Sequence, residues 1–170
     1  MQERRYKFSW ELLGDIGARE NLGPLVRVEV YRLMQFCFRD VLEKRYGTEE
    51  TDSFFREAGK LAGEQFCRQF FSEEKDFASF VNSAQKILRD LGVGILRVEE
   101  ADLNAGSFVM TVGEDLDCSG LPELDYEFCA YDEGFLAGLL GAFTKREVTV
   151  KEVDCWCTGA RTCRFQAQLL

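Results

Sequence analysis

Histidine is absent from this 170-residue sequence. Its absence excludes Ser-His-Asp and Cys-His catalytic pairs, and it excludes haem or zinc sites held through histidine. Any bound metal must therefore be held by cysteine, aspartate, glutamate or backbone oxygen. Any proton transfer must use carboxylates, lysine, tyrosine or cysteine.

Basic charge and long apolar runs are also scarce. The net charge is −9, and an acidic surface disfavours nucleic acid and anionic membranes as partners, because both attract lysine and arginine clusters. No stretch reaches the roughly 20 apolar residues of a membrane span, and MQERRYKFSW lacks the apolar run of a secretory signal. We therefore expect a cytoplasmic protein without a membrane span. In that compartment, clustered cysteines favour metal or redox chemistry over structural disulfides.

Apolar residues are plentiful at 46%, with 15 phenylalanines, and predict one domain spanning residues 1–170. A helical period of apolar residues predicts helices at 27–47, 48–71, 75–92 and 129–143. A period of two predicts strands at 94–102, 107–115, 147–156 and 162–170. Helices, hairpin, helix and hairpin in this order predict an α+β fold, with a mostly antiparallel sheet packed against helices.

Several side chains in the predicted helices have a structural interpretation. The first helix is predicted to be amphipathic, with apolar residues at Val30, Leu33, Met34, Cys37, Phe38 and Val41. Cys37 and Cys67 are expected to be small buried hydrophobes. The second and fourth helices carry small residues that predict close helix packing within the subunit, with a dimer face or ligand space as the alternative: Ala58, Gly59, Ala62, Gly63, Gly134, Gly138 and Gly141.

Three of the seven cysteines lie in the C-terminal segment KEVDCWCTGARTCRF. Strand alternation places Glu152 and Cys163 on the core side of the last hairpin. A buried carboxylate without a basic partner on the same face is costly unless it is paired, and a metal ion is one such partner. Cys155 joins this pair only if a bulge or turn interrupts the strand. Cys129 opens the fourth helix, where free N–H groups favour a thiolate.

These residues form a candidate metal site of three thiolates and one carboxylate: Cys129, Glu152, Cys155 and Cys163. Such a closed set suits structural Zn²⁺ and disfavours Mg²⁺ and Ca²⁺. From spacing alone, zinc, redox-active thiols and ordinary packing remain alternatives. Cys157 could also replace one of the four ligands.

The pattern C-x-Y-x-E-G-F-x-A-G, followed by E-x2-C-x7-C, resembles the 4-vinyl reductase domain. This small bacterial and archaeal domain is named for a bacteriochlorophyll-synthesis protein, and it also serves as the aromatic-sensing module of phenol- and xylene-responsive transcription activators. Further similar stretches extend over nearly the whole chain: FSWELLGDIG, VYRLMQF, REAGKLAGEQF, EDLDCSGLP and YDEGFLAGLL. The phenol sensors hold zinc with the spacing C-x22-E-x2-C-x7-C. The resemblance therefore implies zinc at Cys129, Glu152, Cys155 and Cys163.

The resemblance also implies a fold related to Golgi transport-particle subunits and haem-based nitric oxide sensors. With that fold come a helix-built homodimer and a hydrophobic pocket between helices and sheet. The phenol sensors anchor the ligand hydroxyl with a histidine, which this chain lacks, so phenol and histidine-bound haem are not expected. Candidate pocket residues are Phe54, Phe55, Phe66 and Trp156, because small hydrophobic ligands bind among apolar side chains. The alternative for the phenylalanines is the core.

A non-catalytic sensor module is the leading functional interpretation. It binds a small hydrophobic or aromatic ligand and passes a signal to a downstream protein. One alternative is a dimeric assembly scaffold with a structural zinc. Another is a component of a tetrapyrrole vinyl reductase, although the sequence shows no nicotinamide or flavin site for such chemistry.

Overall fold

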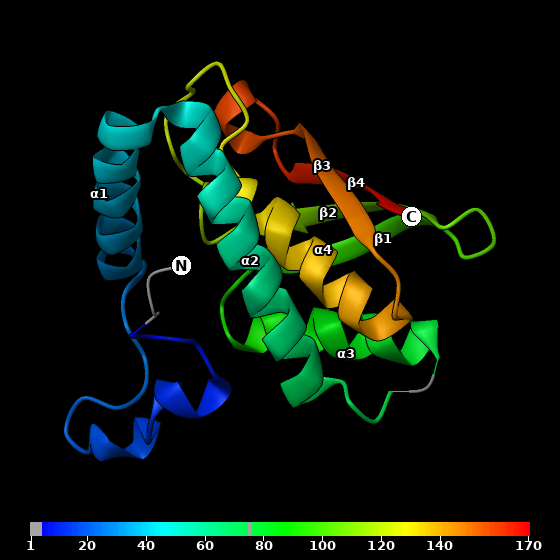
Figure 1. The fold of residues 1–170 in the computed structure, drawn as a ribbon, viewed down its shortest axis with the longest axis horizontal. Helices are drawn as coiled ribbons and strands as arrows, with labels where there is room; N and C mark the ends of the chain where they lie inside the picture. Colours follow the sequence, from blue (N-terminus) through cyan, green and yellow to red (C-terminus); the bar gives the residue numbers. More distant parts are fainter. Residues whose placement is uncertain (1–4, 75) are drawn as a thin grey trace.

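Four α-helices and a four-stranded antiparallel sheet make up residues 5–74 and 76–170, the part of the chain that the computed structural model describes (Figure 1). The helices are α1 (Val28–Tyr46), α2 (Thr48–Phe70), α3 (Phe77–Asp90) and α4 (Ala130–Thr144). The strands are β1 (Ile95–Asp102), β2 (Ser107–Gly113), β3 (Val148–Asp154) and β4 (Cys163–Leu169). Three short 3-10 helices are η1 (Trp10–Leu13), η2 (Ile16–Ala18) and η3 (Trp156–Thr158). The predicted α+β fold is confirmed.

Local signals set the helix ends. Asp76 caps α3, since its side chain accepts the backbone N–H of Ser79 at 2.9 Å. Gly47 ends α1 with a φ of 82°, which favours glycine. Lys75, the first residue of the predicted third helix, lies outside the described residues, as do residues 1–4 of the N-terminal stretch examined for a secretory signal.

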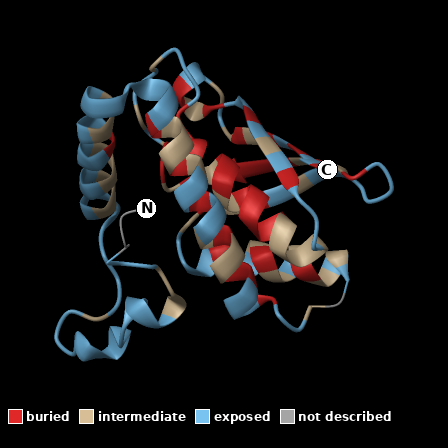
Figure 2. Cartoon of the chain, in the orientation of Figure 1, coloured by how far each residue is buried: buried red, intermediate tan, exposed pale blue. Residues whose placement is uncertain are grey.

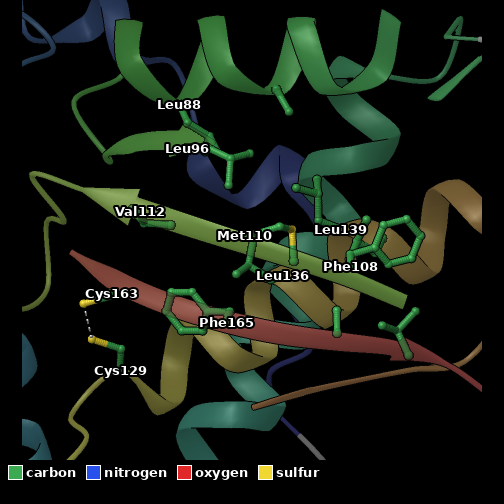
Figure 3. Packing of buried hydrophobic residues seen from close by; sticks show 14 of the residues in the cluster. Leu88, Leu96, Phe108, Met110, Val112, Cys129, Leu136, Leu139, Cys163 and Phe165 are labelled. Carbon is green, nitrogen blue, oxygen red and sulfur yellow. Dashed lines mark hydrogen bonds between the residues drawn. The ribbon is translucent and has the colours of Figure 1, made fainter. Parts of the chain in front are cut away.

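The sheet has the strand order β1-β2-β4-β3, so the last strand in the chain lies between β2 and β3. The predicted alternation in β3 is confirmed, because Val148 and Glu152 are buried whereas Thr149 and Lys151 are exposed. The β3–β4 register shifts after Glu152, which is the irregularity that Cys155 requires. Side chains of β1, β2 and β4 meet α3 and α4 in one core that includes Leu88, Leu96, Met110, Leu136 and Phe165 (Figure 3).

Helices α2 and α4 pack backbone against backbone. A Cβ atom added at Gly63 would lie 2.1 Å from the carbonyl oxygen of Phe135, and one at Gly138 would lie 2.1 Å from that of Lys60. Real Cβ atoms do not approach another atom so closely. The predicted close packing within the subunit is therefore confirmed, and α4 lies between α2 and the sheet (Figure 1).

Helix α1 lies beside α2, away from the sheet, and most of its surface is exposed (Figure 2). The expectation that Cys37 is buried is wrong, because the apolar face of α1 is not covered within the described residues. Five large apolar side chains there are between 45% and 69% exposed: Val30, Leu33, Met34, Phe38 and Val41. Among the described residues, no helix combines the length and the hydropathy needed to cross a membrane.

Candidate metal centre and ligand pocket

Four buried cysteines gather at one end of the sheet. The Sγ atoms of Cys118, Cys129, Cys155 and Cys163 all lie within 4.8 Å of one another. The sulfur of Cys163 lies 3.1 Å from that of Cys118 and 3.7 Å from that of Cys129, which is itself 3.9 Å from the sulfur of Cys155. Figure 3 shows Cys129 and Cys163 pointing toward each other beside the core. These four thiols, the cysteine cluster, could hold a metal ion.

The cysteine cluster has the dimensions of a tetrahedral site. Zinc–sulfur bonds of about 2.3 Å give a tetrahedron with edges of about 3.8 Å. The sulfur–sulfur distances of 3.7 and 3.9 Å match this edge, and the 3.1 Å contact is shorter. All seven cysteines are free thiols, so no disulfide competes for these sulfur atoms.

Each sulfur comes from a different segment of the fold. Cys129 is the residue before α4, Cys155 precedes η3, and Cys163 is the first residue of β4. Cys118 belongs to the loop after β2, where one carboxylate oxygen of Asp115 accepts the backbone N–H groups of residues 117 and 118 at 2.8 and 2.9 Å. This aspartate turn fixes the loop and turns Cys118 inward.

The thiols of the cluster compete for protons. Hydrogen bonds from Cys118, Cys129 and Cys163 lower the pKa of Cys155. Hydrogen bonds with its three neighbours, together with burial, raise the pKa of Cys129. One thiolate is thus stabilised at the expense of the others. A cation is required for all four to ionise together, because unpaired charges are costly in a buried site.

Glu152 lies beside the cluster. Its Oε2 atom accepts the backbone N–H of Cys129 at 3.0 Å, whereas its Oε1 atom is buried without a hydrogen-bond partner among the described residues. Burial and the neighbouring charge of Cys155 raise the pKa of Glu152 to about 8. The structure thus brings three predicted ligands together with Cys118 and leaves Glu152 adjacent to them.

Sequence reasoning missed Cys118 because the segment EDLDCSGLPELD resembles a solvated acidic loop. Two features of the sequence could have indicated a buried cysteine in an ordered turn. They are the apolar residues Leu116 and Leu121 on either side of Cys118, and the aspartate three residues before it. Cys157, which was considered as a replacement ligand, is buried but lies outside the group of four.

Two apolar pockets lie on the helical side of the domain. The smaller, of about 410 Å³, lies between α1 and α2 and is lined by Met34, Phe38, Leu42, Phe54, Phe55 and Ala58. The larger, of about 520 Å³, has apolar walls that include Trp10, Leu61, Ala62, Phe66, Val93 and Phe135. The two share the lining residues Tyr31, Ala58 and Tyr131, so they are adjacent, and we refer to them as the two lobes of one hollow.

Three of the four predicted pocket residues line these lobes, and the fourth, Trp156, lies elsewhere. Phe54 and Phe55 line the smaller lobe, and Phe66 lines the larger one while also belonging to the core. Trp156 lines neither lobe. Its Nε1–H donates to the carbonyl oxygen of Leu121 at 3.0 Å, close to the cysteine cluster.

Polar contacts tie α1 to the loop that carries Cys118. The hydroxyl of Tyr31 and the amide of Gln35 each donate to the Asp117 carboxylate at 2.8 Å. Arg32 donates to the carbonyl oxygens of Leu116 at 2.7 Å and of residue 119 at 2.9 Å. Burial raises the pKa of Asp117, although the bonds from Gln35 and Tyr31 oppose that shift. The smaller lobe is therefore bounded by a helix that the loop carrying Cys118 helps to hold.

Comparisons with known proteins found relatives in sequence and in fold. An uncharacterized protein of Methanocaldococcus jannaschii is 24% identical over 151 residues, covering 89% of this chain and 83% of that relative. A crystal structure of a vinyl-4-reductase family protein from the same organism superposes with a TM-score of 0.66 at 15% identity, covering 99% of both chains.

Two further solved structures share the fold. The phenol-responsive sensory domain of the transcription activator PoxR, solved with phenol, gives a TM-score of 0.63 at 16% identity and covers 85% of this chain and 75% of that one. A trafficking protein particle complex subunit 3 from Naegleria fowleri, covalently bound to palmitic acid, gives a TM-score of 0.66 at 13% identity. The match covers 84% of this chain and 95% of that one. At these identities the likeness shows the fold, which is the fold predicted from the sequence.

The family assignment rests on the segment that carries most of the site. The model of the V4R domain matches residues 108–169. This range contains β2 except its first residue, all of α4, β3 and β4, and all four sulfur atoms of the cysteine cluster. The resemblance to the 4-vinyl reductase family is therefore confirmed, since residues 108–169 of this chain match the model of the V4R domain.

Proposed function

We propose that this protein is a non-catalytic module that binds a small hydrophobic ligand and is braced by one zinc ion. The observation that carries the proposal is the buried group of four sulfur atoms at the base of α4, the helix that also lines the two-lobed hollow. The sensory domain of PoxR, which shares the fold, was solved with phenol, and this likeness supports a ligand-binding role.

The proposed zinc ligands are Cys118, Cys129, Cys155 and Cys163. A tetrahedral set of sulfur ligands suits zinc or iron, and the small space between the sulfur atoms suits a single ion. Zinc, when bound, supplies a cross-link between segments that are distant in sequence and contributes folding free energy. In this arrangement Glu152 orients the N–H of Cys129 from outside the ligand set.

Metal analysis of the purified protein tests this ligand set. We expect one zinc per chain, and Cys118→Ser should lower zinc affinity at least tenfold. Cys157→Ser is the matched control, because Cys157 is equally buried but lies outside the cluster. Glu152→Gln should retain most of the zinc. Loss of zinc in Glu152→Gln with full retention in Cys118→Ser would instead support the ligand set predicted from the family spacing.

Pocket binding is tested separately by native mass spectrometry of the zinc-loaded protein. We expect small hydrophobic or aromatic molecules to bind with a stoichiometry of one per chain. Ala58→Phe should abolish this binding, because Ala58 lies on the wall that both lobes share. Unchanged binding by that variant would place the ligand elsewhere.

We also propose that a second copy of the chain covers the apolar face of α1, and that a bound ligand is signalled to a downstream protein through this dimer. The support is the row of exposed apolar side chains on α1. Light scattering after size exclusion should show a dimer, and Leu33→Asp should yield a monomer of unchanged zinc content. A dimer without pocket binding would favour the assembly scaffold.

A further inference from the structure

A second group of potential metal ligands adjoins the cysteine cluster and shares one of its sulfur atoms. The Sγ atom of Cys129 and one carboxylate oxygen each of Asp115 and Asp132 lie within 4.8 Å of one another. Asp115 belongs to the loop after β2, and Asp132 lies in the first turn of α4. The same two segments carry Cys118 and Cys129, so the fold that assembles the cysteine cluster also assembles this group.

Asp132 has a carboxylate oxygen that the protein leaves unused. Its Oδ2 atom is buried and has no hydrogen-bond partner among residues 5–74 and 76–170. Neither Asp132 nor Asp115 forms an ion pair with a lysine or arginine of the described chain. Burial raises the pKa of both carboxyl groups, and the charged groups that act most strongly on Asp132 are acidic as well. Two neighbouring buried carboxylates of this kind require either a shared proton or a cation.

A small cavity has both aspartates in its wall. Its volume is about 20 Å³, which is enough for one water molecule. Apart from Asp115 and Asp132, its wall consists of apolar residues and one glycine: Leu88, Val93, Gly94, Val112, Phe135 and Leu136. Asp132 also lines the larger lobe, as do Val93 and Phe135, so the cavity adjoins that lobe and an ion can reach it from there.

We propose that Asp115, Cys129 and Asp132 form a second site for a divalent transition-metal ion such as zinc or cobalt, and that the Cys129 sulfur bridges this ion and the ion of the cysteine cluster. A water molecule in the small cavity completes the coordination. The thiolate favours these metals over Mg²⁺ and Ca²⁺, and carboxylate oxygen is an ordinary ligand of zinc. Three protein ligands bind more weakly than four sulfur atoms, so the cysteine cluster fills first and the second site fills when metal is added. This site goes beyond the proposed ligand-binding function and does not depend on it.

Titration of the zinc-loaded protein with Co²⁺ tests the second site. A thiolate bound to Co²⁺ gives a charge-transfer absorption band in the near ultraviolet, so the spectrum reports whether the added ion contacts the Cys129 sulfur. We expect the total metal to rise from one ion to two per chain, with this band present and no zinc released. Asp132→Asn, which keeps the size of the side chain, should weaken cobalt binding at least about tenfold and leave the zinc in place. Asp132→Ala, which also removes the amide oxygen, should abolish the band.

Asp117→Asn is the matched control, because Asp117 is a buried carboxylate of the same loop that lies outside both groups of potential ligands. It should bind cobalt as the wild type does. A total that stays at one metal per chain, including cobalt that replaces zinc ion for ion, would overturn the second site and mean that the two aspartates share a proton. Two metals per chain in Asp132→Ala would overturn it as well. If the cysteine cluster takes up no zinc, the zinc proposal fails, and cobalt binding that still depends on Asp132 would uphold the second site alone.

Discussion

Glu133 joins three elements through one buried carboxylate. It accepts hydrogen bonds from Arg56 of α2 at 2.5 Å, from Lys151 of β3 at 2.9 Å and from the backbone N–H of Glu152 at 2.8 Å. Burial alone would raise the pKa of Glu133, but these three donors outweigh burial and lower it. The side chain thereby holds α4 in line with the edge strand next to the cysteine cluster.

Glu133→Gln should destabilise the protein by about 1–3 kcal/mol near neutral pH, because it weakens bonds to charged donors. The folded-state pKa of Glu133 lies below the unfolded value, so its stabilisation is present above about pH 4.5 and is lost as the pH falls through the folded pKa. Urea unfolding between pH 7 and pH 3 measures both effects. The exposed Glu100→Gln serves as the control, and an equal acid dependence in Glu133→Gln and wild type would refute the role.

At the cysteine cluster, the sequence predicted the strand residues of the site but not the loop residue. The alternation of β3 and β4 correctly placed Glu152 and Cys163 on the inner face, and the predicted interruption after Glu152 is present. Cys118 could not be inferred in this way, because its position depends on a turn closed by Asp115 and not on a regular period. Loops positioned by such side-chain bonds have no repeating signal in sequence.

At the level of elements, the α2–α4 contact depends on glycine backbone approaching carbonyl oxygens. Gly59 and Gly63 of α2 face Tyr131 and Phe135 of α4, while Gly134 and Gly138 of α4 face α2 in return. Glycine costs about 1 kcal/mol in a helix interior relative to alanine. The fold retains it in both helices because no side chain fits between the two backbones.

Gly138→Ala should therefore destabilise the protein by at least about 1–3 kcal/mol, the usual cost of overpacking, despite the better helix propensity of alanine. Gly141→Ala is the matched control in the same helix, because its added Cβ would lie 3.1 Å from the nearest atom instead of 2.1 Å. Thermal unfolding measures both variants. A smaller loss for Gly138→Ala than for Gly141→Ala would show that the helices can separate without cost.

Helix α1 illustrates what an apolar period does not determine. Its existence and its end at Gly47 followed from the pattern of residues. The pattern could not tell which surface its apolar face meets, since a face that packs on the core and a face that packs on another chain have the same spacing. In the structure, the apolar face of α1, which includes Leu33 and Phe38, is exposed.

At the level of the whole molecule, the loop 115–119 connects the cysteine cluster to α1. It contributes Cys118 to the cluster and accepts hydrogen bonds from Tyr31, Arg32 and Gln35 on α1. These bonds are one attachment of α1, beside the ion pair of Arg39 with Asp52 of α2 and the edge contact of Phe36 with Phe128. With zinc bound to the cysteine cluster, as proposed above, the order of this loop is expected to depend on the metal.

Chelation of the metal should therefore speed amide hydrogen exchange in residues 115–119 and in α1. Cys118→Ser should have a similar effect without chelator, whereas Cys157→Ser should not. Helix α3 serves as the internal reference, because it packs on β1 at the other edge of the sheet. Unchanged exchange in α1 after complete metal removal would show that the order of α1 does not depend on a metal at the cysteine cluster.

The strand order has a consequence for how the chain is made. Because β4 lies between β2 and β3, the edges of those two strands that face β4 are unpaired until β4 has left the ribosome. Open edges of this kind invite pairing with other chains. Cys163 is the first residue of the same strand, so the nascent protein acquires the inner strand that joins β2 to β3 and the fourth sulfur of the cysteine cluster together.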